Sequence, residues 1–124
     1  MRGLLFAVLL TTGCATKHSA PAPTPTEPAT FDSCVIAHMV AIRALEEADE
    51  GPGSADEALL TAVLASKGAL LADERLDEGE QAQRDSVLMS SYARGADAAF
   101  AEATARGATN QELADAALGC GREL

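Results

Sequence analysis

Apolar residues recur at intervals of three and four from residue 31 to the C-terminus, and this periodicity limits the fold more than any other feature. In the first periodic segment they form one broad helix face made of Val35, Ile36, Met39, Ile42 and Leu45. No stretch alternates apolar and polar residues at the period of two that a half-buried strand shows. The chain lacks tryptophan and is rich in alanine, which has the highest helix propensity. The sequence therefore predicts an all-α fold.

The first two of four predicted helices lie on either side of a Gly-Pro-Gly-Ser sequence. Helix one begins at Asp32 or Ser33, either of which is a good N-cap, and ends with Gly51 as its C-cap. Residues 54–57, Ser-Ala-Asp-Glu, form a capping box that opens helix two. The large apolar residues of helix two cover nearly its whole circumference, and they are Leu59, Leu60, Val63, Leu64, Leu70 and Leu71. We therefore expect helix two to be the central and most buried helix.

The second half of the chain predicts a long helix followed by a short one. Residues 72–81 are strongly charged and form either a loop or a frayed helix junction. Helix three runs from about 82 to 106 and stops at Gly107. Residues 109–112, Thr-Asn-Gln-Glu, form a second capping box, which starts a last helix that ends near Gly119. Short connections between helices favour a small antiparallel bundle of about four helices.

The charge of the chain limits its partners. Nineteen acidic residues stand against nine basic ones, which gives a formal net charge of −10. Nucleic acid and anionic lipid surfaces reward clustered basic residues, so neither is expected as a partner. The acidic residues gather at 46–57 and 73–80, but neither group has the ligand spacing of an EF-hand loop. We interpret them as solvated helix ends and loops, with a weak cation site or an acidic docking face as the alternatives.

The first fourteen residues have the features of an export signal. Met1 and Arg2 form a minimal positive segment, and the apolar run GLLFAVLL that follows is too short to span a bilayer. The sequence Thr-Thr-Gly-Cys at 11–14 then resembles the lipobox of bacterial lipoprotein signal peptides, with Thr11 at a position where leucine is usual. An ordinary secretory signal beside a spare cysteine is the alternative interpretation.

The resemblance implies where the protein resides. It implies that residues 1–13 are a removed signal peptide and that the thiol and amine of Cys14 carry lipid. Ala15 after the cysteine implies the outer membrane, with the protein facing the periplasm. The partners expected on this basis are the membrane, reached through the lipid anchor, and a protein of the cell envelope.

Residues 14–30 are predicted to be a flexible tether. Four of the five prolines lie between residues 20 and 30, alternating with alanine and threonine. Such a sequence favours extended polyproline II and offers no core. At roughly 3.1 Å per residue, the tether could reach about 50 Å. The folded helical domain is then expected to occupy residues 31–124.

Two cysteines remain once Cys14 is assigned to lipid. Cys34 opens the first helix and Cys120 closes the last, and in an oxidising compartment a disulfide between them is the favoured interpretation. Closing a loop of this length stabilises a domain by about 4 kcal/mol in the chain-entropy model. A redox pair or a metal site are the competing interpretations, but neither cysteine belongs to a Cys-x-x-Cys motif, and no further ligand follows closely in sequence.

Catalytic motifs are absent from the sequence. It contains no Gly-x-Ser-x-Gly, no Ser-x-x-Lys and no phosphate-binding glycine loop. Of the two histidines, His18 lies in the tether, and His38 is interpreted as a packed or half-exposed helical residue. We therefore expect no catalytic residue, no metal site, no cofactor and no enzymatic activity.

The remaining expectation is a binding role in the envelope. The candidate interaction face consists of Tyr92, Arg94 and Phe100 on helix three, together with the acidic loops. The domain is expected to be an interaction or assembly module that binds another envelope component. The alternatives are an immunity-type inhibitor of a basic toxin and an acid-responsive chaperone or small-ligand binder.

Overall fold

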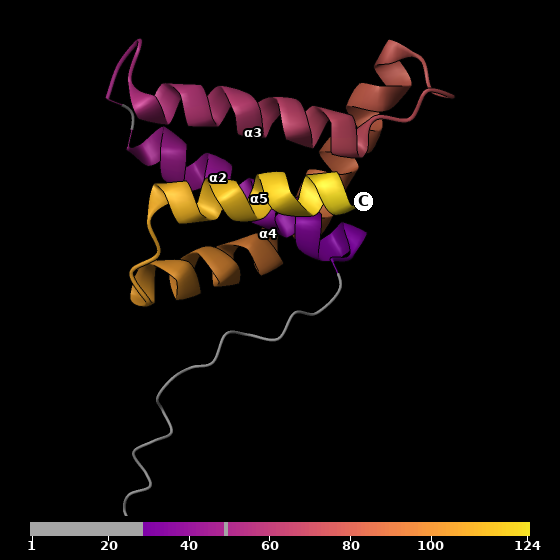
Figure 1. The fold of residues 1–124 in the computed structure, drawn as a ribbon. Helices are drawn as coiled ribbons and strands as arrows, with labels where there is room; N and C mark the ends of the chain where they lie inside the picture. The colour runs from indigo at the N-terminus through magenta and orange to yellow at the C-terminus, as the bar shows by residue number, and fades with distance from the viewer. Residues whose placement is uncertain (1–28, 49) are drawn as a thin grey trace, which may run out of the picture.

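A computed structural model describes residues 29–48 and 50–124. Within these ranges the chain forms four helices, α2 (Phe31–Glu47), α3 (Ala55–Leu71), α4 (Glu78–Ala105) and α5 (Asn110–Glu123), and no strand (Figure 1). The predicted all-α bundle of four helices is confirmed. The predicted signal peptide, Cys14 and most of the predicted tether lie outside the described residues. No helix among the described residues is long and apolar enough to cross a membrane.

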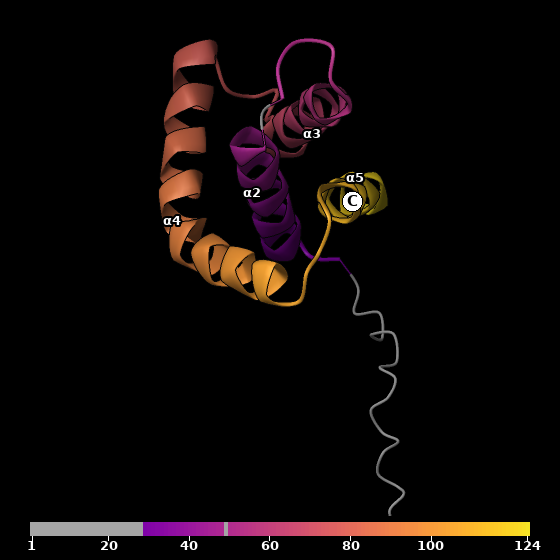
Figure 2. The same cartoon turned by 90° about the vertical axis from the view of Figure 1, so that its left-hand side faces the viewer.

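Helix α2 lies in the middle of the domain. Helices α3 and α5 pack against α2 and against each other, while α4 packs on another side of α2 (Figure 2). Helices α3 and α5 run in the same direction and α2 runs in the opposite one (Figure 1). The four-helix arrangement is therefore organised around α2, with α4 separated from the pair formed by α3 and α5.

The burial pattern corrects the expectation that helix two, which is α3, is central. Helix α2 buries Cys34, Val35, His38, Val40, Ala41 and Leu45, whereas α3 buries only Val63 and Leu71. A helix with neighbours on part of its circumference cannot cover leucines placed all around it, and Leu64 is 42% exposed as a result. The prediction that α3 is the central helix, which was based on its many leucines, is therefore wrong.

Small side chains close the core between α2 and α5. Its buried cluster joins large and small residues from three helices, namely Ala41, Leu45, Val63, Ala114 and Ala117. The alanines bring the α5 backbone close to α2, and Leu45 and Val63 fill the space beside them. Alanine thus contributes close helix approach here as well as helix propensity.

The helix starts test the predicted caps. Helix α2 begins two or three residues earlier than expected, because Thr30 is the N-cap: Ser33 N–H donates to Thr30 Oγ1 at 3.0 Å, and Thr30 N–H donates to Ser33 Oγ at 3.1 Å. The helix ends at Glu47 with Ala48 as its C-cap, so the predicted C-cap at Gly51 is wrong. Ser54 caps α3 as predicted, although the Glu57 carboxylate accepts from Gly53 N–H instead of Ser54 N–H. The capping box at Thr109 is confirmed in full, but α5 continues to Glu123, past its predicted end near Gly119.

Helix α4 starts inside the segment that the sequence left as a loop or a frayed junction. Asp77 is its N-cap, and Glu80 completes a capping box by accepting from Asp77 N–H at 3.0 Å. The helix ends as predicted at Gly107, whose φ of +74° favours glycine. There Gly107 N–H donates to Thr104 O and Ala108 N–H donates to Ala103 O, the paired bonds of a Schellman motif.

Helix α4 is strongly bent, so that its first half runs along one side of the domain and its second half passes beneath α2 (Figure 2). Near its middle, the Ser91 hydroxyl donates to the carbonyl of Val87 at 2.9 Å. Such a side-chain bond to the carbonyl four residues earlier is associated with helix bending. The bend lets one helix contact α2 with both of its halves.

Replacing Leu45 with alanine tests whether α2 is the central helix. Leu45 is 1% exposed in the core cluster, so we expect Leu45→Ala to lower the free energy of unfolding by about 2–5 kcal/mol. The matched control is Leu64→Ala on α3, where we expect a loss below about 1 kcal/mol, because much of that side chain already contacts solvent. Chemical denaturation followed by circular dichroism measures both, and equal losses would contradict the assignment.

Candidate functional site

A groove lies between α2 and α4. Its volume is about 270 Å³. The apolar lining comes from both helices and consists of Met39, Val40, Ile42, Met89, Ala93 and Ala96. The wall formed by α4 carries alanines, whose methyl groups do not fill the space beside α2. The groove is therefore a consequence of small residues on α4 facing larger residues on α2.

Four charged residues border this groove, namely Arg43, Glu46, Lys67 and Asp97. Arg43 Nη1 lies 3.3 Å from Asp97 Oδ1, and Arg43 Nε lies 3.3 Å from Glu47 Oε2. The Arg43 guanidinium also stacks on Phe100, with Cζ 4.0 Å from the ring centroid, a cation–π arrangement. Arg43 thus joins α2 to α4 at one end of the groove.

The other two charges at the groove have no ion-pair partner among the described residues. Lys67 of α3 is half-buried and Glu46 of α2 is exposed. An ammonium and a carboxylate without intramolecular partners can each form a hydrogen bond with a bound molecule. The groove therefore combines an apolar centre with two available charges at its edge.

Two of the three residues of the predicted interaction face make contacts within the domain. Tyr92 donates its hydroxyl proton to the Asp32 carboxylate at the start of α2, and this hydrogen bond, with partial burial, raises the pKa of Tyr92. Phe100 is half-buried beneath Arg43. Arg94 is exposed. The two aromatic side chains are partly buried and contact α2, and Arg94 is the most exposed of the three.

The predicted disulfide joins Cys34 in α2 to Cys120 in α5, with their Cα atoms 5.7 Å apart. Next to it lies His38, which is completely buried. His38 Nδ1 is 2.7 Å from the carbonyl oxygen of Cys34, and Nε2 is 2.8 Å from the hydroxyl of Ser66 in α3. A carbonyl only accepts, so Nδ1 carries the ring proton and Nε2 accepts from Ser66. The sequence prediction of a packed or half-exposed histidine is thus resolved as a fully packed one.

Ser66 was not identified from the sequence, because no motif links it to a histidine 28 residues away. A serine hydrogen-bonded to a histidine resembles a catalytic nucleophile and its base, and here the Cys34 carbonyl orients the histidine as a third group. Here, however, α5 lies directly over the hydroxyl: a Cβ atom on Gly121 would lie 2.7 Å from Ser66 Oγ. Glycine permits this close approach, and α5 leaves no space for a substrate on that side. The pair instead satisfies two polar groups inside the domain.

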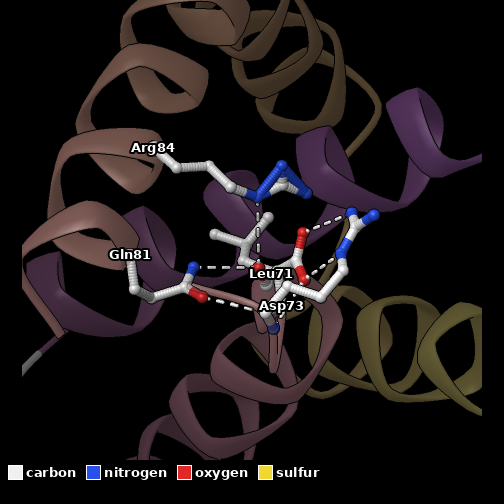
Figure 3. Close-up of polar contacts among 5 residues, drawn as sticks. Leu71, Asp73, Gln81 and Arg84 are labelled. Atoms are coloured by element: carbon white, nitrogen blue, oxygen red, sulfur yellow. Dashed lines mark hydrogen bonds and ion pairs between the residues drawn. The ribbon is translucent and has the colours of Figure 1, made fainter. Parts of the chain in front are cut away.

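The acidic segment between α3 and α4 folds around the last carbonyls of α3. Figure 3 shows Gln81 and Arg84 from α4 pointing at the Leu71 carbonyl, which accepts from Gln81 Nε2 at 3.0 Å and Arg84 Nε at 3.5 Å. Gln81 Oε1 in turn accepts from Asp73 N–H at 2.9 Å. Because helix ends leave carbonyls unsatisfied, these bonds cap α3 and fix the start of α4.

Asp73 is engaged within this segment by a neighbouring arginine. Its carboxylate accepts from Arg75 Nε at 2.9 Å and Arg75 Nη2 at 2.8 Å, and also from the Arg75 backbone N–H at 3.0 Å. These bonds, the side-chain ones first, hold the pKa of Asp73 well below its usual range. A carboxylate already bonded in this way is a poor candidate ligand for the weak cation site considered from the sequence.

Comparisons of the chain with protein-family models, with curated proteins and with solved structures find no match. The functional argument therefore rests on the groove, the disulfide cluster and the sequence itself.

The lowered pKa of Asp73 predicts how stability depends on pH. Its contribution is fully present above the pKa of an unfolded aspartate, about 3.9, and is lost as pH falls toward the lower folded value. We therefore expect Asp73→Asn to be less stable than the parent chain at pH 6, and the difference to shrink below about pH 4.

Urea denaturation between pH 6 and pH 2 measures this difference. Asp115→Asn is the control, because Asp115 is exposed, lies on α5 and forms no ion pair with a described residue. A difference between Asp73→Asn and the parent chain that persists unchanged down to pH 2 would contradict the Arg75 explanation.

Proposed function

We propose that this chain is a lipid-anchored lipoprotein of the bacterial envelope, whose acidic helical domain binds another envelope protein through the groove between α2 and α4. The domain acts by binding and not by catalysis. The groove is the observation that carries the binding proposal. The lipobox-like sequence that ends at Cys14 carries the proposal of the anchor.

The size of the groove supports a protein partner. Pockets that enclose a drug-sized ligand usually measure about 300–1,000 Å³, and this groove of about 270 Å³ falls just below that range. One or two apolar side chains of a partner suit such a volume. Met39 and Met89 suit contact with a partner as well, because their flexible thioethers adapt to different shapes.

The charge of the domain indicates the chemistry of the partner. Residues 29–124 contain 18 acidic and seven basic residues, which gives a formal net charge of −11. Two of the basic residues, Arg43 and Arg75, are already paired with carboxylates. A field of this sign accelerates the approach of a basic surface. The proposed partner therefore has one or two apolar side chains that enter the groove, surrounded by basic residues.

The tether supports the same role. A lipid on Cys14 would confine the domain to a surface, and this raises its effective concentration toward partners there. With a net charge of −11, the domain is repelled by anionic lipid, so the tether holds it near the membrane without laying it on the surface.

Intact mass spectrometry of membrane-extracted protein tests the anchor. We expect the mass of residues 14–124 plus a diacylglyceryl group and a further acyl chain, with two alkylatable thiols appearing only after reduction. Cys14→Ser is the control and should lose both the acyl mass and the membrane association. Recovery of the parent chain as a soluble, unlipidated protein with a free Cys14 thiol would overturn the anchor.

Site-specific photo-crosslinking in intact cells tests the groove. A photoreactive residue at Ala93, an exposed position of the groove wall, should give one discrete adduct with an envelope protein. The matched control is Ala98, which is exposed on the same helix but does not line the groove. Equal adducts from both positions, no adduct from Ala93, or an adduct of Ala93 with lipid alone would contradict the proposed partner.

A further inference from the structure

The cluster around the disulfide contains a histidine as well as the two cysteines, so it holds three potential metal ligands. Cys34, His38 and Cys120 each offer a ligand atom, and these atoms all lie within 4.8 Å of one another. His38 lies one helical turn after Cys34 in α2, and Cys120 reaches the same place from α5. The sequence suggested a metal site only as a competing interpretation of the two cysteines, and it did not place His38 with both of them, because Cys120 is far from His38 along the chain.

We propose that the reduced domain binds Zn²⁺ through Cys34, Cys120 and His38. Zinc in proteins takes thiolate and imidazole ligands in tetrahedral geometry, with Zn–S near 2.3 Å and Zn–N near 2.0–2.1 Å. Ligand atoms around such an ion lie about 3.3–3.8 Å apart. The nitrogen nearest to Cys34 is His38 Nδ1, 3.8 Å from Sγ, which already matches that separation. Two changes are needed once the disulfide is broken: the sulfur atoms move apart, and the imidazole turns so that Nδ1, which donates to the Cys34 carbonyl at 2.7 Å in the oxidised chain, faces the ion instead.

Reduction of the Cys34–Cys120 disulfide must come before zinc binding, and a dithiol can act as the reductant. The dithiol gives two electrons and two protons to the Cys34–Cys120 bond, becomes a disulfide itself, and leaves two thiols. Zn²⁺ then displaces one proton from each thiol to the solvent, and the ion keeps its charge. The same two helices are thus joined by a covalent bond in the oxidised chain and by a metal ion in the reduced chain.

Ser66 gives the histidine the partner that a metal ligand needs. Metal-bound histidines usually donate their second ring N–H to an oxygen acceptor, which fixes the orientation of the ring. When Nδ1 binds the ion, the ring proton moves to Nε2, which lies 2.8 Å from Ser66 Oγ. A serine hydroxyl can donate or accept, so Ser66 can change from donor to acceptor when the ring proton moves to Nε2. Ser66 is thus a positioning residue for this site.

Burial indicates the path of the ion. Cys34 and His38 are fully buried, whereas Cys120 is partly exposed. The ion therefore enters from the Cys120 side, where water can supply a fourth ligand, as in zinc sites with three protein ligands. This inference is independent of the proposed binding role, because the groove and this cluster share no residue.

The test titrates the reduced full-length chain with Co²⁺, a spectroscopic substitute for Zn²⁺, and then displaces it with Zn²⁺. Every sample carries Cys14→Ser, so that Cys14 cannot supply a thiolate. We expect one Co²⁺ per chain, with a thiolate-to-cobalt charge-transfer absorption that Zn²⁺ abolishes. The oxidised chain is the control and should show no such absorption. A reduced chain without this absorption would overturn the proposal.

Three variants assign the ligands. Cys120→Ser should halve the charge-transfer intensity, because one thiolate remains. His38→Gln keeps a polar partner for Ser66 and should weaken Zn²⁺ binding by more than Ser66→Ala, for which a loss of about 10–100-fold is expected. Circular dichroism checks that each variant remains helical. If His38→Gln does not fold, Ser66→Ala alone decides, and unchanged affinity in that variant would contradict the role of the histidine.

Discussion

The burial of α2 between α4 and the pair formed by α3 and α5 is the constraint on which the rest of the domain depends. A central helix must satisfy every polar group that it carries inward, and His38 is such a group. Ser66 of α3 supplies one hydrogen bond, and the carbonyl of Cys34 accepts the other. In the same turns Cys34 joins α5 covalently, so one end of α2 is fixed by specific bonds. Its other end is held by the nonpolar cluster around Leu45.

Alanine has two opposite effects in this domain. Between α2 and α5, Ala114 and Ala117 are fully buried and allow the helices to approach closely. Between α2 and α4, Ala93 and Ala96 leave the groove, because charged and aromatic contacts hold the helices there instead. The Arg43 interactions and the Tyr92–Asp32 bond are directional and do not require the space between them to be filled. The same composition therefore builds a tight core on one side and an open surface on the other.

The sequence predicted several local features correctly and the nonlocal ones poorly, although both ends of α2 and the last turn of α5 differ from the prediction. The caps at Ser54 and Thr109 and the stop at Gly107 depend on a few adjacent residues, so they could be read directly. The capping box at Asp77 and Glu80 was also present in the sequence, but Gly79 and the surrounding charges made that segment resemble a loop. The central helix was misassigned because burial depends on how many neighbours a helix has and not on how many leucines it contains.

The candidate sites likewise include one that could be predicted from the sequence and two that could not. The disulfide could be predicted because, once Cys14 was set aside, two cysteines remained to pair. The bond between His38 and Ser66 could not, since it joins two helices across 28 residues and no motif marks it. The groove could not be predicted either, because it depends on the angle at which α4 packs against α2. Tyr92 and Phe100 were noticed as aromatic residues, but their contacts with Asp32 and Arg43 could not be predicted, because they join α4 to α2 across many residues of sequence.

The position of the disulfide also has a mechanical consequence. Cys34 lies in the first turn of α2, where the chain enters the domain, and Cys120 lies close to the C-terminus. Tension applied from the N-terminal side reaches Cys34 before it can unravel more than that turn, and it then passes into both arms of a closed loop. A load applied between the N-terminal segment and a point on the groove therefore acts on a closed loop, and the shorter arm of that loop limits how far the chain can extend. The disulfide thus limits the extension of the domain when it is pulled from its N-terminal end.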